Sequence, residues 1–460
     1  MKMVRAIVLV FLGFAIAGAA CSGGDRSNNS RQNVLNHRRA HLPKNVIILI
    51  GDGCGFNHIK SADYYLCGET PCQKYENFPV RLAMSTYPAG GEYDPKVAWC
   101  SFDYVYSGYT DSAAAATTMA AGVKTYNAAI GVDINGVSVM NLAERAEQMG
   151  KSTGVITSVP FSHATPAGFV VHNGNRNNYT QITSAMINDS AADVIMGCGH
   201  PLYNANGGAA NPNYRYISSI VWNDLKNGSA GADADADGIA DPWKLVQTRA
   251  EFQALAKGDT PKRVFGLPQV YETLQEKRSG NRFAAPYQVP LIQSVPTLEE
   301  LTLAALNILD ENHNGFFIMI EGGAIDWAAH GNESGRLIEE MDDFNNSIEA
   351  VIDWVRKNSN WGETLVIITA DHETGYLTGP GSGQLPQGPV WNDLVANGIG
   401  VLPTMEWHSS SHTNSLVPFF AKGRGARLFK NKIAGYDPVR GPYIDNTDIA
   451  NVIFSLWPAD

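Results

Sequence analysis

Ser112 stands directly before four alanines in the stretch "YTDSAAAATTMAAGVKTYN", residues 109–127. Alanine is the strongest helix former and Gly122 fits a helix C-terminus, so the pattern predicts a helix that begins at or near Ser112. Two interpretations are open. Asp111 and Ser112 cap the helix, which is the commoner role of these residue types. Alternatively, the Ser112 hydroxyl is a nucleophile aimed at an anion, which the free N–H groups and the dipole of a helix N-terminus attract.

Carboxylates and an imidazole follow several apolar segments of strand length. These segments are "KNVIILIGDGCG", "STGVITSV" near 152–159, "GFFIMIEGG" near 315–323 and "ETLVIITADHETG" near 363–375. Asp52 follows the first segment, Glu321 ends the third, and Asp371 and His372 follow the fourth. A single Asp at such a place is usually a turn residue. Several together favour a site, because open α/β sheets bind ligands at the carboxyl ends of their strands.

Asp326 and His330 are four positions apart in "GGAIDWAAH", just after Glu321. On a helix this spacing puts both side chains on one face, as in paired zinc ligands. The pair alone is a weak signal, and its position beside Glu321 strengthens it.

Two polar segments supply further candidates. "HSSSHTNS" carries His408 and His412, and "FSHATPAGFVVHNGNRNNY" carries His163, Thr165, His172 and Arg176. An arginine among Asn and Gly is usually solvated, but a guanidinium is also the best bidentate partner for a phosphate.

The elements that must position these residues alternate in type. Helical patterns such as "VMNLAERAEQMG" and "LIEEMDDFNNSIEAVIDWVRKN" lie between the apolar strands, which predicts an α/β fold with a mostly parallel sheet.

A chain of 460 residues is long enough for one large domain or two smaller ones. The net charge of -11 argues against a nucleic acid or an anionic lipid surface as partner. Any site for an anion must therefore carry its own positive charge.

The N-terminus has the features of a secretory signal peptide over residues 1–20. Basic residues precede an apolar run that is too short for a membrane span and is followed by small residues. Cys21 comes next and begins a polar tether, residues 21–42, as at a bacterial lipoprotein processing site where this cysteine is acylated. Ordinary cleavage near Ala17-Gly18-Ala19 is the alternative. Both predict export, to the periplasm or to an outer-membrane lipid anchor, and the lipid would be the only membrane contact.

The remaining cysteines do not form a disulfide scaffold in a chain of this length. Cys67 and Cys72 bracket a short loop and are able to pair. We expect Cys54, Cys100 and Cys198 to be buried thiols.

An inserted loop is expected at about 204–242, because "NGSAGADADADGIADPW" breaks the alternation of strands and helices. Its Asp233, Asp235, Asp237 and Asp241 have the spacing of oxygen ligands around calcium. Lys244 stands where an EF-hand requires glutamate, so this is not an EF-hand. A looser calcium (Ca2+) loop and a solvated acidic loop both remain open.

Six segments in order, "LIGDG", "TDSAAAATTMAAGVKTYN", "HATPAG", "IEGGAIDWAAH", "TADHETG" and "SHTNS", resemble the alkaline phosphatase family. The resemblance runs from about Asn45 to the C-terminus. It implies a three-layer α/β/α sandwich, a single catalytic domain over 43–460, and hydrolysis of small phosphate monoesters. It also implies that Ser112 is the phosphorylated nucleophile and that Arg176 clamps the non-bridging phosphate oxygens. Many relatives are homodimers, so a homodimer is a further possible partner state.

The resemblance implies a metal centre of two zinc ions (Zn2+) and one magnesium ion (Mg2+). The first zinc would be held by Asp326, His330 and His412, the second by Asp52, Asp371 and His372, and the magnesium by Asp52, Thr165 and Glu321. The ligand types agree, because imidazole with carboxylate suits zinc and an all-oxygen set suits magnesium. A zinc and a helix N-terminus would stabilise the Ser112 alkoxide, and the other zinc would stabilise the leaving oxygen.

Two positions depart from the best-known bacterial pattern of the family. His163 and Trp327 stand where that pattern has Asp and Lys. His163 would change the third metal site, so another divalent ion would compete with magnesium there. Trp327 removes a positive charge near the phosphate, which we expect to weaken phosphate binding and to ease product release.

Other functions remain open for this set of residues. Related enzymes with the same metal site cleave phosphodiesters or sulfate esters. A surface-tethered protein that only binds phosphate or metal is the alternative from another class, because a fold alone does not settle function.

Overall fold

The computed structural model describes residues 42–234 and 238–459, and the chain from Pro43 onward forms one compact unit. The predicted signal peptide and nearly all of the predicted tether, Cys21 included, lie outside the described residues. Their processing, acylation and export therefore stay predictions. Within the two described ranges, no helix is long and apolar enough to cross a membrane.

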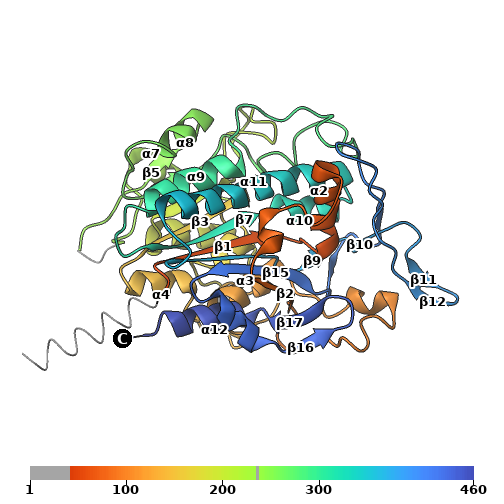
Figure 1. Cartoon of the computed structure of the whole chain (residues 1–460). Coiled ribbons are helices and arrows are strands. Elements are labelled where there is room, and N and C mark those ends of the chain that lie inside the picture. The colour runs from red at the N-terminus through yellow and green to blue at the C-terminus, as the bar shows by residue number, and fades with distance from the viewer. Residues whose placement is uncertain (1–41, 235–237, 460) are drawn as a thin grey trace, which may run out of the picture. The chain divides into compact units, whose positions relative to one another are not determined.

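An eleven-stranded sheet runs through the middle of the unit (Figure 1). Its strands, in spatial order, are β16 (Gly435–Asp437), β17 (Gly441–Asp445), β2 (Val80–Ser85), β15 (Val417–Gly423), β8 (Thr364–Thr369), β1 (Asn45–Gly51), β7 (Phe316–Gly322), β3 (Ser152–Pro160), β4 (Val194–Cys198), β6 (Val264–Gly266) and β5 (Lys244–Val246). The pairs from β8 to β5 are parallel, whereas β15 runs antiparallel to both of its neighbours.

The four strands predicted from apolar runs are confirmed as β1, β3, β7 and β8, and they are neighbours in the sheet. Ile50 of β1 is in register with Glu321 of β7 and with Thr369 of β8. All seven residues of β1 are buried, because a central parallel strand is covered on both faces. The carboxyl ends of these strands therefore meet at one edge of the sheet.

Helices cover both faces of the sheet, which confirms the three-layer α/β/α sandwich (Figure 1). On one face α11 (Ser334–Asn358) packs on α2 (Phe56–Cys67), α9 (Leu298–Leu309) and α10 (Ala324–His330). On the other face α12 (Thr447–Leu456) packs on α3 (Ser112–Ala121) and α4 (Leu142–Gln148). The other helices are α5 (Ala164–Gly168), α6 (Tyr179–Ser184), α7 (Ser219–Asn227) and α8 (Arg249–Leu255).

Short strands lie outside the main sheet. They are β9 (Glu373–Thr374), β10 (Leu377–Thr378), β11 (Gly383–Leu385), β12 (Gly388–Val390), β13 (Glu406–Trp407) and β14 (His412–Thr413). The antiparallel pair β9–β14 brings His412 opposite Thr374, two residues after His372. Segments 40 residues apart in the sequence are thereby joined beside the end of β8.

The cysteines follow the prediction with one exception. Cys67 and Cys72 form a disulfide, and Cys54 and Cys198 are buried. The expectation that Cys100 is buried is wrong. It is exposed, because it lies in a surface loop where its thiol contacts the Lys96 carbonyl oxygen.

Candidate active site

Asp111, and not Ser112, caps helix α3. The Asp111 Oδ1 atom accepts hydrogen bonds from the backbone N–H groups of Ala114 and Ala128, each at 3.0 Å. Ser112 is the first residue of the helix, and its Oγ atom lies 3.3 Å from Nε2 of His372. Because Asp111 satisfies the helix end, the Ser112 hydroxyl is not consumed by capping and faces the residues at the strand ends. The geometry therefore favours the nucleophile interpretation.

Arg176 is held beside the start of this helix by the same aspartate. Its Nη1 donates to Asp111 Oδ2 at 3.0 Å, and its backbone N–H donates to the Ala128 carbonyl oxygen at 2.8 Å. Burial lowers the pKa of Arg176, but Asp111 outweighs burial and leaves the pKa above its ordinary value. The guanidinium stays charged and oriented at the edge of the pocket.

Asp52, Asp371 and His372 converge where β1 and β8 end. His372 Nε2 lies 3.2 Å from Asp371 Oδ2 and 3.5 Å from Asp52 Oδ1, and all three side chains are buried. The backbone N–H of Gly53 donates to the other Asp371 oxygen at 3.1 Å. Two carboxylates and an imidazole at this spacing form a set of donors that suits zinc.

Asp326, His330 and His412 form a neighbouring set. Asp326 and His330 lie in α10, as their spacing predicts, with His330 Nε2 3.4 Å from Asp326 Oδ2. His412 Nε2 lies 3.6 Å from Asp326 Oδ1 and 3.1 Å from His330 Nε2. The Nδ1 atoms of the two histidines face the carbonyl oxygens of Ser410 and Thr110, at 2.7 and 2.9 Å. Such contacts fix the ring orientation and direct both Nε2 atoms towards Asp326.

A third group lies behind Asp52, around Glu321 at the end of β7. The Glu321 Oε2 atom accepts a hydrogen bond from Thr157. The buried atoms without a hydrogen-bond partner among the described residues include Asp52 Oδ1, Thr165 Oγ1 and Glu321 Oε1, and also Nδ1 of His163, which lines the neighbouring pocket. Buried polar atoms without partners are costly, so this cluster fits a bound cation better than it fits a packed core.

The electrostatics of the site support the same view. Burial raises the pKa of Asp52 well above its ordinary value, and Asp371 and Asp326 raise it further. Burial also raises the pKa of Asp371 to about 8 and that of Glu321 to about 7. Burial lowers the pKa of His372 well below its ordinary value. A divalent cation would neutralise the crowded carboxylates, and a neutral imidazole is the form of histidine that binds a metal ion.

Ser112 and the set of Asp326, His330 and His412 open onto one pocket of about 350 Å³. It is lined by Ser112, His163, Arg176, Lys277, Asp326, Trp327, His330 and His412. Lys277 is the member that the sequence analysis missed. It lies between β6 and α9 in a stretch without periodicity or motif, so no signal in the sequence singles it out.

Two histidines of the candidate segments lie away from the metal-ligand sets. His172 contacts the Gly131 carbonyl oxygen and Glu144 Oε1, at 2.6 and 2.8 Å. His408 Nε2 lies 2.7 Å from Thr378 Oγ1. Both rings are held by hydrogen-bond contacts with protein groups. Their place in polar segments beside candidate ligands therefore did not indicate metal binding.

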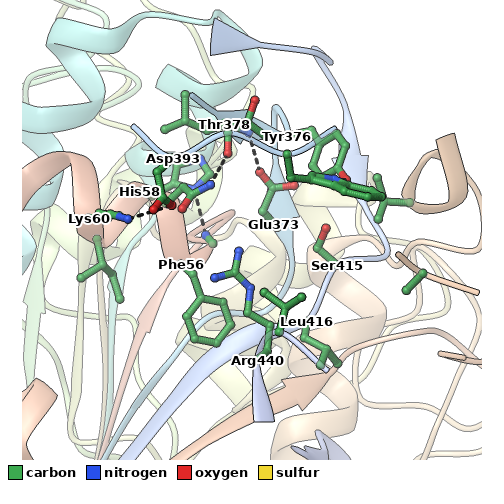
Figure 2. Close-up of a pocket in the computed structure, with 18 of the residues that line it drawn as sticks. Phe56, His58, Lys60, Glu373, Tyr376, Thr378, Asp393, Ser415, Leu416 and Arg440 are labelled. Carbon is green, nitrogen blue, oxygen red and sulfur yellow. Dashed lines mark hydrogen bonds and ion pairs between the residues drawn. The ribbon is translucent and has the colours of Figure 1, made fainter. Parts of the chain in front are cut away.

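A second cavity, of about 360 Å³, is lined by residues of β9 and of several other segments (Figure 2). Glu373 and Arg440 line it, and none of its lining residues lines the catalytic pocket. Glu373 directly follows His372, and its carboxylate accepts a hydrogen bond from Thr413, the residue after His412. This buried contact ties β9 to β14 and so fixes two candidate metal ligands relative to each other.

The Asp-rich loop is partly described. Asp235 and Asp237 lie outside the described residues. Asp241 Oδ1 pairs with Lys262 at 2.7 Å and its Oδ2 accepts from the Ala234 N–H at 3.1 Å. Asp233 accepts from the Gly238 N–H at 2.8 Å. These contacts give Asp233 and Asp241 a structural role without an ion, and calcium binding stays a prediction.

The fold and the site together indicate a class of enzyme. Carboxylate and imidazole donors at the ends of adjacent parallel strands, beside a serine at a helix N-terminus, are typical of a metal-dependent hydrolase. The sequence model of the family described as alkaline phosphatase matches residues 43–391. The chain therefore belongs to the alkaline phosphatase family, whose members are metal-dependent hydrolases of phosphate esters.

Individual relatives agree over nearly the whole chain. The chain is 29% identical to alkaline phosphatase 4 of Bacillus subtilis, over 98% of this chain and 95% of the relative. It is 30% identical to the alkaline phosphatase of Escherichia fergusonii, over 96% and 90%. The solved alkaline phosphatase of the Antarctic bacterium TAB5 is 26% identical, with a TM-score of 0.62 over 91% of this chain and 100% of that one.

Proposed function

We propose that the protein is an alkaline phosphatase that hydrolyses small phosphate monoesters through a phosphoserine at Ser112. The observation that carries the proposal is the Ser112 hydroxyl, left free by the Asp111 cap and 3.3 Å from His372 Nε2. Its surroundings supply what the reaction needs, namely candidate metal ligands on one side and the Arg176 guanidinium in the same pocket.

The donor sets favour two zinc ions and a third divalent ion. Asp326, His330 and His412 would hold one zinc, and Asp52, Asp371 and His372 the other. Asp52, Thr165 and Glu321 would hold the third ion, with His163 beside them. When bound, the ions would lower the pKa of the attacking hydroxyl and of water and would neutralise the leaving oxygen.

The chain's own residues perform the remaining work. Ser112 Oγ forms a bond to phosphorus and loses its proton to solvent, while the bond from phosphorus to the ester oxygen breaks on the opposite side and that oxygen takes a proton from water to leave as the alcohol. Arg176 holds two non-bridging oxygens with its fork of N–H groups, and the free N–H groups at the start of α3 add positive potential. Water then cleaves the phosphoserine and releases inorganic phosphate. The N-terminal pattern agrees with a phosphatase that works outside the cytoplasm.

The third ion is magnesium in our proposal, and we place His163 next to its site by the resemblance to the family. In this chain the buried Thr165 hydroxyl and Glu321 carboxylate provide oxygen donors of the kind that magnesium prefers. The His163 nitrogen leaves room for a softer ion to compete.

Turnover of three aryl esters tests the proposed reaction. We expect the zinc- and magnesium-loaded protein to hydrolyse p-nitrophenyl phosphate at alkaline pH. The kcat/KM for p-nitrophenyl phosphate should exceed the values for bis(p-nitrophenyl) phosphate and for p-nitrophenyl sulfate by at least about a thousandfold. A site whose polar groups all pair with the preferred substrate discriminates against an analogue that leaves some of those groups unpaired. Faster hydrolysis of the diester or of the sulfate would replace the proposal with one of its alternatives, and no turnover of any ester would favour a binding protein.

A further inference from the structure

Lys277 brings a second positive charge to the catalytic pocket. Its Nζ lies 5.1 Å from the ring centroid of Trp327, the residue that follows the metal-ligand candidate Asp326. The Trp327 ring in turn meets the His163 ring edge-on at 5.7 Å. An ammonium over the face of an indole is held by the ring's quadrupole.

Glu276 holds the ammonium without entering the pocket. Its Oε1 atom lies 2.9 Å from Lys277 Nζ, and the Glu276 side chain is fully buried whereas that of Lys277 is 29% exposed. The Lys277 backbone N–H also donates to Thr273 Oγ1 at 2.7 Å. An ammonium has three donors, so the contact with Glu276 leaves two for a ligand.

Arg176 and Lys277 are arranged in the same way. Each lines the pocket, and each is paired with a carboxylate, Asp111 or Glu276, that does not line it. Each acid partner orients its cation and leaves some of its N–H donors unused in a pocket that Ser112 also lines. At alkaline pH a phosphate monoester carries two negative charges on its terminal phosphoryl group, whereas a diester carries one.

We propose that Lys277 is a second phosphate-binding residue, which matches the pocket to a dianion and so selects monoesters over diesters. The role rests on the proposed function. It also revises the expectation that Trp327 leaves the pocket without the family's second positive charge. The charge is present, but it comes from the stretch between β6 and α9 instead of from α10.

Replacing Lys277 by methionine tests the proposal, since methionine keeps most of the side-chain length and removes the charge. In the metal-loaded enzyme we expect Lys277→Met to raise the KM for p-nitrophenyl phosphate and the inhibition constant of inorganic phosphate by about tenfold or more. The KM for bis(p-nitrophenyl) phosphate should rise much less. Lys277→Arg should keep most of the affinity.

Lys226→Met is the matched control, because the Lys226 Nζ lies over the Trp222 ring at 5.5 Å and does not line the pocket. This variant should leave all three constants unchanged. Equal losses for the monoester and the diester in Lys277→Met would indicate a structural role and overturn the proposal, as would unchanged constants.

Moving the charge provides an independent test. In the Lys277→Met background, Trp327→Lys returns an ammonium to the pocket from α10, and we expect it to recover phosphate affinity. In the wild-type background, Trp327→Lys should tighten inhibition by inorganic phosphate. A double variant that binds phosphate no better than Lys277→Met would contradict the charge explanation.

Calorimetric titration with inorganic phosphate separates this proposal from the proposed function, because it requires no turnover. Suppose that the metal-loaded wild type binds phosphate but hydrolyses no monoester. The proposed reaction is then wrong, but weaker phosphate binding by Lys277→Met still supports the role of Lys277. If the wild type does not bind phosphate, both fail.

Discussion

Ser112→Ala is expected to reduce kcat for p-nitrophenyl phosphate by at least about 10³-fold, because the nucleophile of a covalent route is lost while the surrounding charges remain. The fold should be retained. Asp111 supplies the cap of α3 through its bond to the Ala114 N–H, and alanine at the first helical position creates no unpaired buried group. The loss should therefore appear in kcat, with little change in thermal stability.

Ser219→Ala is the matched control, since Ser219 is also the first residue of a helix, α7, behind a separate cap at Ser218, and it is exposed. Its turnover should equal that of the wild type. Acid quenching of wild-type turnover should trap one phosphoryl group on the peptide that contains Ser112, and none in Ser112→Ala. A trapped phosphoryl group on another residue, or near-normal turnover in Ser112→Ala, would mean that Ser112 is not the nucleophile and that water or another group attacks directly.

The parts of the site that could be predicted are those set by local periodicity. The apolar runs predicted β1, β7 and β8 as buried parallel strands, whose carboxyl ends lie at one edge of a sheet. Asp52 and Asp371 come just after β1 and β8, and Glu321 is the next-to-last residue of β7. The four-residue spacing of Asp326 and His330 was also enough to predict that the two side chains share one face of a helix.

The parts that could not be predicted depend on tertiary contacts. In the fold, the Lys277 side chain lies over Trp327 and pairs with the preceding residue Glu276, and neither contact leaves a pattern in the sequence. The antiparallel strand β15 contains Pro418, a residue that normally argues against a central strand. Cys100 is exposed because of the path of its loop, which hydrophobicity alone does not determine.

Metal removal is the second change with a large expected effect, and it should act on stability as well as on turnover. We expect chelation to abolish hydrolysis and to lower the melting temperature at pH 8 by roughly 10 °C, since ions that bind only the folded state stabilise it by mass action. Adding zinc and magnesium back should restore both. A chelated protein with unchanged melting temperature would show that Asp52, Asp371 and Glu321 are not metal ligands.

The pH dependence of this loss follows from the buried carboxyl groups. In the metal-free fold, burial raises the pKa of Asp371 to about 8 and that of Glu321 to about 7, whereas the unfolded chain releases these protons near pH 4. Unfolding then releases protons, so the free energy of unfolding of the metal-free protein falls as pH rises between about 4 and 8. The metal-loaded protein should not show this fall, because the ions stabilise the ionised carboxylates. The difference in melting temperature should therefore widen from pH 5 to pH 8.

Asp52→Asn separates electrostatic crowding from simple loss of a ligand. Burial raises the pKa of Asp52, and the neighbouring carboxylates Asp371, Asp326 and Glu321 raise it further, so removing the charge of Asp52 relieves desolvation and repulsion when no metal is present. Chelated Asp52→Asn is expected to melt above the chelated wild type at pH 8. With zinc and magnesium the order should reverse, because Asp52 is the carboxylate that the second zinc and the third ion would share. A variant less stable than the wild type in both states would indicate that Asp52 supports the fold by contacts that do not involve a cation.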